Sequence, residues 1–143
     1  MGPFTTAANL AGTEKILRAM RKDKENLHKL LDFAADATIE VGRKFVENKI
    51  GIGLAEPTAS LLSPKQFREF VIPYYVKVMD KWKEWGSHGS GFHICGDTTK
   101  LLETFLKWVS EASVSTVLLI SLTQKKQSAI NFLLWEMYPL WKS

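Results

Sequence analysis

Two short apolar segments, set apart by a longer stretch with helical periodicity, constrain the fold of this chain more than any other feature of its sequence. Residues 49–55 read KIGIGLA and residues 92–95 read FHIC. The first segment ends at Glu56-Pro57, and a turn-rich stretch at residues 86–91 precedes the second. Strands that alternate with helices of this length predict a parallel sheet with helical crossovers. The predicted fold class is therefore α/β.

The region before the first strand is predicted to be helical after a short loop. Residues 2–5 read as a loop, Thr13 as the N-cap of a first helix, and a longer helix runs from about Lys24 to Asn48. The apolar positions of the longer helix recur at three- and four-residue steps and predict one buried stripe: Leu27, Leu30, Leu31, Ala34, Ala37, Val41 and Phe45. The strand at residues 49–55 is apolar after Lys49, which is typical of a parallel strand covered on both faces.

Two further helices are predicted after the first strand. Ser63 is placed as an N-cap and Pro64 at the first helical position, while Pro73 is expected to kink the helix near its first turns. Residues 96–99 cap a last helix, whose apolar positions are Leu101, Leu102, Phe105, Leu106 and Val109. Three tryptophans at helical spacing are interpreted as packing residues rather than a ligand cage: Trp82, Trp85 and Trp108.

His93 and Cys95 form the most informative pair of side chains. Residues two apart on a strand project to the same face, so the imidazole and the thiol are expected to point together. Both lie at the C-terminal end of the strand, where barrel enzymes display reactive groups. Nitrogen and thiolate together suit Zn²⁺, but a catalytic zinc usually has three protein ligands. The alternative from spacing alone is a half-buried cysteine beside a hydrogen-bonded histidine.

Glu56 occupies the equivalent end of the preceding strand and is the candidate catalytic residue at the same mouth. The alternative is that Glu56 caps the following loop or pairs with a lysine. His28 and His88 have no partner at meaningful spacing and are interpreted as surface residues.

Charge and cysteine content exclude several classes of protein. The formal net charge of +4 is small and dispersed, which argues against nucleic acid binding. Residues 1–4 have neither the basic start nor the apolar run of a signal peptide, so none is expected. The longest apolar run, residues 117–122, is far below the ~20 residues of a membrane span. Cys95 is the single cysteine, which excludes an internal disulfide and suits a reducing compartment. We therefore expect a cytoplasmic protein with no membrane partner.

Taken together, three segments resemble the uroporphyrinogen decarboxylase superfamily in order and spacing. They are GPFT at residues 2–5, EPTAS with SPKQF at residues 56–67, and HICGD at residues 93–97. The HICG segment is similar in particular to the methylcobamide:coenzyme M methyltransferase branch. The resemblance spans about residues 2–114, and the combination is specific although no single motif is.

This resemblance implies a (β/α)₈ barrel and a metal-dependent methyl transfer. In the methyltransferase branch, a zinc held by the His and Cys of H-x-C and by a distant C-terminal Cys binds a thiol such as coenzyme M. The thiolate takes a methyl group from a methylcobamide carried by a partner corrinoid protein, and zinc favours the thiolate over the thiol. This resemblance implies that His93 and Cys95 are two of three zinc ligands. In a bacterial relative, the methyl acceptor could be a folate instead of a thiol.

Two alternatives stand beside this interpretation. One is uroporphyrinogen decarboxylase itself, which removes carboxylates from a tetrapyrrole. Asn9 and Pro57 of this chain align with a substrate-contacting tyrosine and serine of that enzyme. This chain also has the residues H-I-C at a place where the decarboxylase has no metal ligands. The other alternative is a gene remnant without enzymatic activity.

The chain is too short for the barrel that the resemblance implies. A (β/α)₈ barrel needs about 250 residues, so 143 residues predict a partial barrel over residues 1–114. Cys95 has no second cysteine to complete a zinc site. We therefore expect the polypeptide alone to be inactive.

Residues 115–143 depart from the family pattern. Tryptophan and methionine have single codons, so a shifted reading frame across residues 135–140 is partly determined. It reads G-[N/D]-V-[S/P]-P, compatible with the G-N-V-[S/D]-P strand motif that the family carries downstream. We hypothesise that residues 115–143 are translated out of frame, which the nucleotide sequence tests. The alternative is a divergent C-terminus with a strand at residues 117–122.

Overall fold

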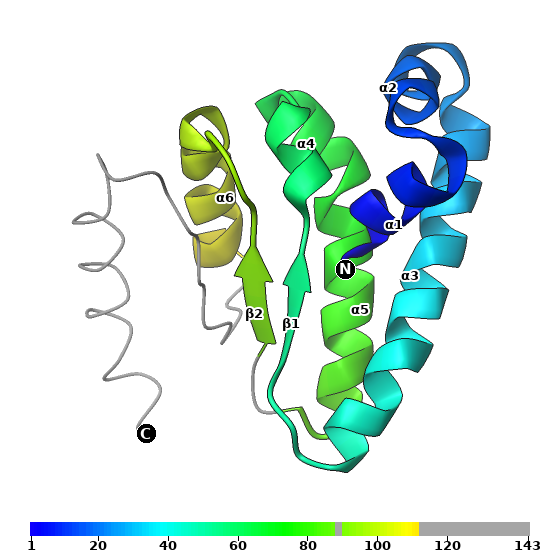
Figure 1. Cartoon of the computed structure of the whole chain (residues 1–143). Coiled ribbons are helices and arrows are strands. Elements are labelled where there is room, and N and C mark those ends of the chain that lie inside the picture. The colour runs from blue at the N-terminus through cyan, green and yellow to red at the C-terminus, as the bar shows by residue number, and fades with distance from the viewer. Residues whose placement is uncertain (88–89, 112–143) are drawn as a thin grey trace.

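A computed structural model describes residues 1–87 and 90–111 of the chain (Figure 1). Helices dominate this part, and two short strands lie between them. The elements are α1 (Pro3–Ala11), α2 (Thr13–Lys22), α3 (Lys24–Glu47), β1 (Ile52–Ala55), the 3₁₀ helix η1 (Pro57–Leu61), α4 (Pro64–Phe70), α5 (Ile72–Glu84), β2 (Ser90–His93) and α6 (Thr99–Glu111). The predicted tail at residues 115–143 and His88 lie outside the described residues. None of the described helices has the length and apolar character that a membrane span requires.

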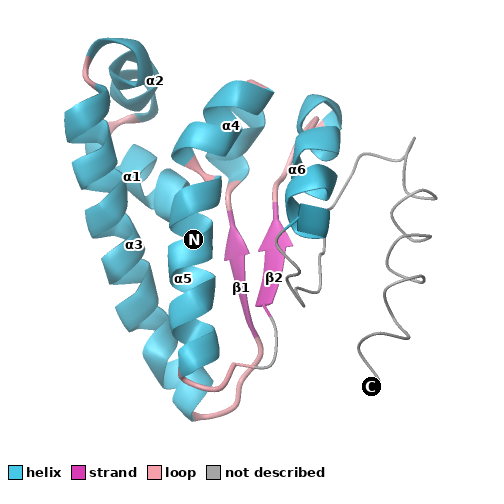
Figure 2. Cartoon of the chain, turned by 180° about the vertical axis from the view of Figure 1, so that it is seen from behind, coloured by secondary structure: helices cyan, strands magenta, loops and turns pink. Residues whose placement is uncertain are grey.

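The two strands pair in parallel, as the sequence predicts, and α4 and α5 form the crossover between them (Figure 2). Leu54 pairs with Phe92, and the Phe92 ring packs on Tyr75 of α5 at 4.5 Å between centroids. This face of the sheet is therefore covered by helices. The other face carries Gly53, which is exposed. The prediction that β1 is covered on both faces is wrong for the described chain, because no described element lies over that second face.

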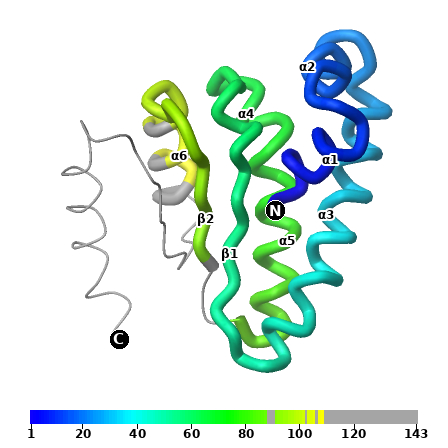
Figure 3. Tube along the Cα trace, in the orientation of Figure 1, coloured from blue at the N-terminus to red at the C-terminus, as the bar shows by residue number. Residues whose placement is uncertain are grey.

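Helix α3 packs along α5 (Figure 3). Trp82 of α5 lies at this contact. Trp82 is 1% exposed, and its indole N–H donates to the Ile39 carbonyl at 3.2 Å. A Cβ atom on Gly42 would come within 2.2 Å of the Trp82 ring, so only glycine lets the two helices approach this closely. The interpretation of Trp82 as a packing residue is confirmed.

The predicted stripe on α3 is correct in its first half and wrong in its second. Leu27, Leu31 and Ala34 are buried, but Val41 and Phe45 are exposed by 69% and 44%. The helix buries another set of residues near its end: Ala35, Thr38, Ile39, Gly42 and Val46. The physical reason is that α5 covers only the side of α3 that carries Ile39 and Gly42.

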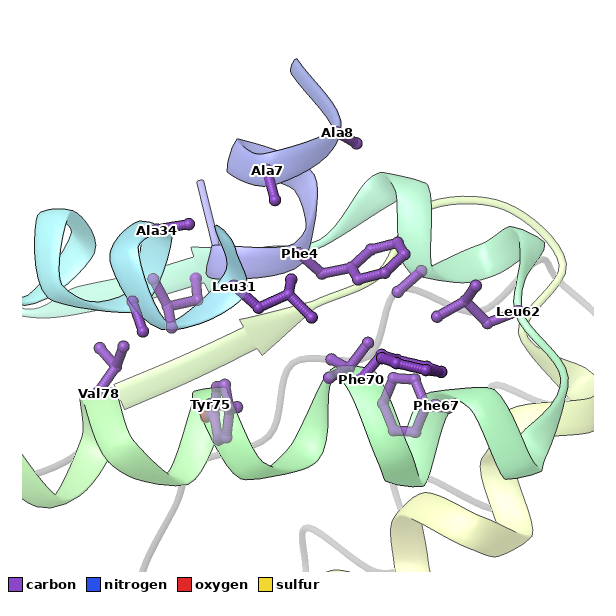
Figure 4. Close-up of a cluster of buried hydrophobic side chains, with 14 of the residues drawn as sticks. Phe4, Ala7, Ala8, Leu31, Ala34, Leu62, Phe67, Phe70, Tyr75 and Val78 are labelled. Atoms are coloured by element: carbon purple, nitrogen blue, oxygen red, sulfur yellow. The ribbon is translucent and has the colours of Figure 1, made fainter. Parts of the chain in front are cut away.

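The N-terminal residues form a helix rather than the predicted loop. Pro3 stands in the first turn of α1, where its missing N–H leaves no hydrogen bond unmade. Gly12, with a φ of 93°, separates α1 from α2. Thr13 is the first residue of α2 rather than its N-cap, and no side chain caps that helix. Figure 4 shows Phe4 of α1 pointing into the buried cluster that contains Phe67 and Phe70.

The start of α4 is confirmed, whereas a break between two helices replaces the predicted kink at Pro73. The Ser63 hydroxyl accepts the Gln66 N–H at 3.3 Å, while the Gln66 side chain accepts the Ser63 N–H at 2.9 Å. This capping box fixes where α4 begins. The helical path breaks at Val71, and α5 restarts with Pro73 in its first turn. Proline therefore separates two helices here instead of kinking one.

The predicted last helix is present as α6. The Asp97 carboxylate accepts the Thr99 N–H at 3.0 Å at the start of the helix. Leu101 and Phe105 are buried, as predicted, and Phe105 stacks on Phe92 at 5.4 Å between centroids. The side chains of Leu102, Leu106 and Val109 lie outside the described part.

Candidate functional site

The loops that follow β1 and β2 lie side by side at the C-terminal ends of the strands. The Glu56 N–H donates to the His93 carbonyl at 2.8 Å, so the backbones stay paired one step beyond β1. Gly96, with a φ of 93°, lies close to Ser60 of η1, since a Cβ atom on Gly96 would be 3.6 Å from the Ser60 hydroxyl. The predicted site residues therefore lie together at one end of the sheet, where β1 and β2 have their C-terminal ends. This end is called the C-terminal edge below.

His93 and Cys95 come together at this edge, although not by the predicted route. The strand ends at His93, so Cys95 lies beyond it and the two-residue strand alternation does not apply. Ile94 between them is 3% exposed and anchors the segment in the core. The chain then turns at Gly96, and the His93 Nε2 and Cys95 Sγ atoms are 2.8 Å apart. The thiol is exposed, so the pair faces open space.

The donor set of this pair fits two positions of a zinc site. Typical Zn–N and Zn–S lengths in a tetrahedron place the two donor atoms about 3.5 Å apart. The observed 2.8 Å is a hydrogen-bond contact that a small side-chain rotation would open to that spacing. Among the residues that the structure describes, no group of three His, Cys, Asp or Glu side chains could hold a metal ion. The described residues thus bring two potential donor atoms together at this point, and no third.

Glu56 is fully buried, and its carboxylate binds the start of α1. One oxygen accepts the Phe4 N–H at 3.0 Å and the other accepts the Thr5 N–H at 2.7 Å. These N–H groups belong to the first turn of a helix, where the helix dipole favours a negative charge. Gly2 is needed beside the carboxylate, because a Cβ atom there would lie 2.2 Å from a carboxylate oxygen. The carboxylate therefore forms its hydrogen bonds with α1, and within the described part of the chain it forms none with the following loop or with a lysine.

Comparisons with known proteins identify the family of the chain. The family model described as "Uroporphyrinogen decarboxylase (URO-D)" matches residues 1–129. The chain belongs to the uroporphyrinogen decarboxylase family. It is also 35% identical over 105 residues to a methylated-thiol–coenzyme M methyltransferase of Methanosarcina mazei, an alignment that covers 70% of this chain and 27% of that protein. The chain thus spans about a quarter of the length of this curated relative. No solved structure gives a significant match.

Within this family member, the sequence did not reveal the partners of two titratable residues. The interpretation of His28 as a surface residue without a partner is wrong: its Nδ1 atom lies 2.6 Å from the Tyr74 hydroxyl and its ring stacks on Phe70. The partner of Glu56 is the backbone of residues 4 and 5. A glycine-proline pair that begins a helix was the available signal for that contact, because such a helix start offers unpaired N–H groups.

The buried carboxylate predicts a pH-dependent stability for this family member. Burial raises the pKa of Glu56 to about 7 from 4.5, although the hydrogen bonds from Thr5 and Phe4 oppose the shift. The folded state thus holds a proton more tightly than the unfolded chain. The stabilisation is complete below about pH 4.5 and is lost as the pH rises through about 7, at a cost of up to about 3 kcal/mol. Urea unfolding at pH 5 and pH 8 measures this loss.

Glu56→Gln serves as the control for the pH dependence, since glutamine does not titrate. The variant should show a smaller fall in unfolding free energy between pH 5 and pH 8 than the parent chain. An identical fall in both proteins would assign the pH dependence to other groups.

Proposed function

We propose that this chain is a piece of a corrinoid-dependent methyltransferase in which His93 and Cys95 are zinc ligands. The observation that carries the proposal is the 2.8 Å approach of His93 Nε2 and Cys95 Sγ at the C-terminal edge of a parallel sheet. The family match and the similarity to a methylated-thiol–coenzyme M methyltransferase support it. Methyl would pass from a methylated corrinoid protein to a small thiol such as coenzyme M.

The residues at this edge suit the binding of a thiol beside a metal. Zinc would supply a positive charge that holds a bound thiol as the nucleophilic thiolate near neutral pH. His93 and Cys95 would hold the metal from one side, with the buried Ile94 fixing their backbone. The exposed Cys95 and Gly96 leave room above the pair for a thiol and for the methyl donor. A catalytic role for Glu56 stays a prediction. Both oxygens of its carboxylate already accept hydrogen bonds from the start of α1.

The same proposal includes the barrel to which this chain belongs and the activity expected of this polypeptide alone. The parallel β1–β2 pair with helical crossovers is the repeating unit of a (β/α)₈ barrel, and we place it as part of such a barrel in the cytoplasm. Two ligands hold zinc more weakly than three, so the described chain should bind the metal without catalysing methyl transfer. The methylcobamide would be carried by the partner corrinoid protein.

Zinc binding tests the proposed site. The purified chain should bind about one zinc ion, and His93→Ala and Cys95→Ala should each weaken binding at least about tenfold, because each removes one of two ligands. Titration with Zn²⁺ against a chromophoric chelator measures the affinity. Cobalt in place of zinc gives a second readout, since the thiolate-to-cobalt absorption band should disappear in Cys95→Ala.

His28→Ala is the matched control for the metal site. His28 is a histidine with a hydrogen-bond partner away from the edge of the sheet, and its removal should leave zinc affinity unchanged. Equal affinity in the parent chain and both site variants would reject His93 and Cys95 as ligands.

Decarboxylation of a tetrapyrrole is the second candidate, and the family match itself favours it. This reaction needs no metal at His93 and Cys95. A chain that binds a porphyrinogen carboxylate with the same affinity before and after treatment with a chelator, and that holds no zinc, would favour the decarboxylase over the methyltransferase.

A further inference from the structure

The backbone on both sides of the His93–Cys95 pair contacts the segment that follows β1. On one side, the His93 carbonyl accepts the Glu56 N–H at 2.8 Å. On the other side, Gly96 lies against Ser60 of η1, where a Cβ atom on Gly96 would be 3.6 Å from the Ser60 hydroxyl. The position of the pair therefore depends on whatever fixes residues 56–60.

The first turn of α1 holds residues 56–60 through two buried polar side chains. The Glu56 carboxylate accepts the N–H groups of Phe4 and Thr5. The Thr5 hydroxyl hydrogen-bonds to the same carboxylate and accepts the Thr58 N–H at 3.4 Å. The Thr5 hydroxyl thus joins three segments of the chain, which are α1, the end of β1 and the start of η1.

Burial makes these hydrogen bonds specific for one arrangement of the segment. Thr5 is 2% exposed and Glu56 is 0% exposed, so water does not readily replace a hydrogen bond that either side chain loses. A shift of residues 56–60 would leave buried polar groups without partners, which is unfavourable. Valine at position 5 would keep the shape of the threonine but would take away the hydroxyl from both of its partners. The hydroxyl group therefore has a role that packing alone does not supply.

We propose that Thr5 is a positioning residue for the metal site, because its hydroxyl holds the Glu56 side chain and the start of η1 in the arrangement that places His93 and Cys95. The inference rests on the proposed function, which takes these two residues as zinc ligands. Thr5 acts through Glu56 and η1, and not as a ligand. Groups that orient metal ligands directly change metal affinity by about 10–100-fold when they are removed. Thr5 acts one step further from the metal, so a smaller effect is expected.

Thr5→Val tests the positioning role through the metal. The variant should bind Zn²⁺ at least about threefold more weakly than the parent chain, measured by titration against a chromophoric chelator. The absorption spectrum of bound Co²⁺ should also change, because the two ligands meet the metal at a different angle. Thr5→Ser keeps the hydroxyl and should restore both the affinity and the spectrum. Parental zinc affinity in Thr5→Val, or no recovery in Thr5→Ser, would overturn the inference.

Thr38→Val is the matched control, since it removes the same hydroxyl from another buried threonine. Thr38 belongs to α3, and its hydroxyl donates to the Ala34 carbonyl at 2.8 Å, away from the C-terminal edge. This variant should have the zinc affinity and the cobalt spectrum of the parent chain. Equal weakening in Thr38→Val and Thr5→Val would assign the effect to a general loss of stability and would contradict a positioning role.

Amide hydrogen exchange of the metal-free chain separates this inference from the proposed function. The Glu56 N–H reports directly on the hydrogen bond to the His93 carbonyl. Its exchange, read by NMR, should be about tenfold faster in Thr5→Val than in the parent chain and in Thr38→Val, because the segment opens more often without the Thr5 hydroxyl. A parent chain that binds no zinc would contradict the proposed function, and the Glu56 amide would still test Thr5. Unchanged exchange of this amide in Thr5→Val would reject the positioning role.

Discussion

Glu56→Ala is expected to lower the free energy of unfolding by about 4 kcal/mol. The variant removes the acceptor of two buried N–H groups at the start of α1, those of Phe4 and Thr5. Each buried donor without a partner costs about 1–3 kcal/mol, and the emptied space adds to the loss. Since Phe4 is fully buried, release of α1 would also expose that ring. Urea unfolding at pH 6, followed by circular dichroism, measures the change.

Glu69→Ala is a matched control for this carboxylate. Glu69 forms an ion pair with Lys24, whose side chain is half exposed, and exposed pairs contribute at most about 1 kcal/mol. A loss in Glu56→Ala no larger than in Glu69→Ala would show that the carboxylate does not hold α1. Glu56→Gln should fall between the parent and the alanine variant, because the amide oxygen still accepts one of the two N–H groups.

Trp82→Ala is expected to cost about 3–5 kcal/mol, the range for removing a buried aromatic side chain from a core. Trp82 fills the contact between α3 and α5, donates to the Ile39 carbonyl and lies directly against Gly42. The surrounding helices cannot close this space easily, because Gly42 offers no side chain to move into it. The midpoint of urea unfolding reports the loss, and m should stay constant if unfolding remains two-state.

Trp85→Ala is the control for Trp82 because it removes the same side chain near the end of the same helix. Trp85 is only partly buried, and its ring lies beneath the Arg43 and Lys81 side chains. Cation–π contacts at exposed sites contribute about 0.5–1 kcal/mol, so this variant should be close to the parent chain. Similar losses in the two variants would contradict the assignment of the core contact to Trp82.

Local patterns in the sequence were sufficient to predict most of the elements. The helix at Lys24–Asn48 and the capping box at Ser63 depend on residues only three or four positions apart, and both were predicted within a residue or two. The two strands and their parallel pairing were predicted too, because glycine-bounded apolar runs separated by helices leave few other arrangements. The exposed half of the α3 stripe was not predicted, since helical periodicity does not say which neighbours are present to cover it.

The candidate site was predicted less completely than the fold. His93 and Cys95 were expected to point together and do so, but the alternation that justified this fails because β2 ends at His93. The surroundings of Glu56 depend on contacts with residues more than fifty positions away, and no local pattern encodes such a contact. The predicted zinc ligation and the out-of-frame tail remain predictions.

The parallel pairing of β1 with β2 also has a consequence for the order in which the chain folds. The two strands are joined only through η1, α4 and α5, so they cannot meet until this crossover has compacted. Helices form in about a microsecond from local contacts, whereas a non-local strand pair must first close a long loop. The His93–Cys95 pair, which extends from the end of β2, would therefore acquire its geometry among the last steps of folding.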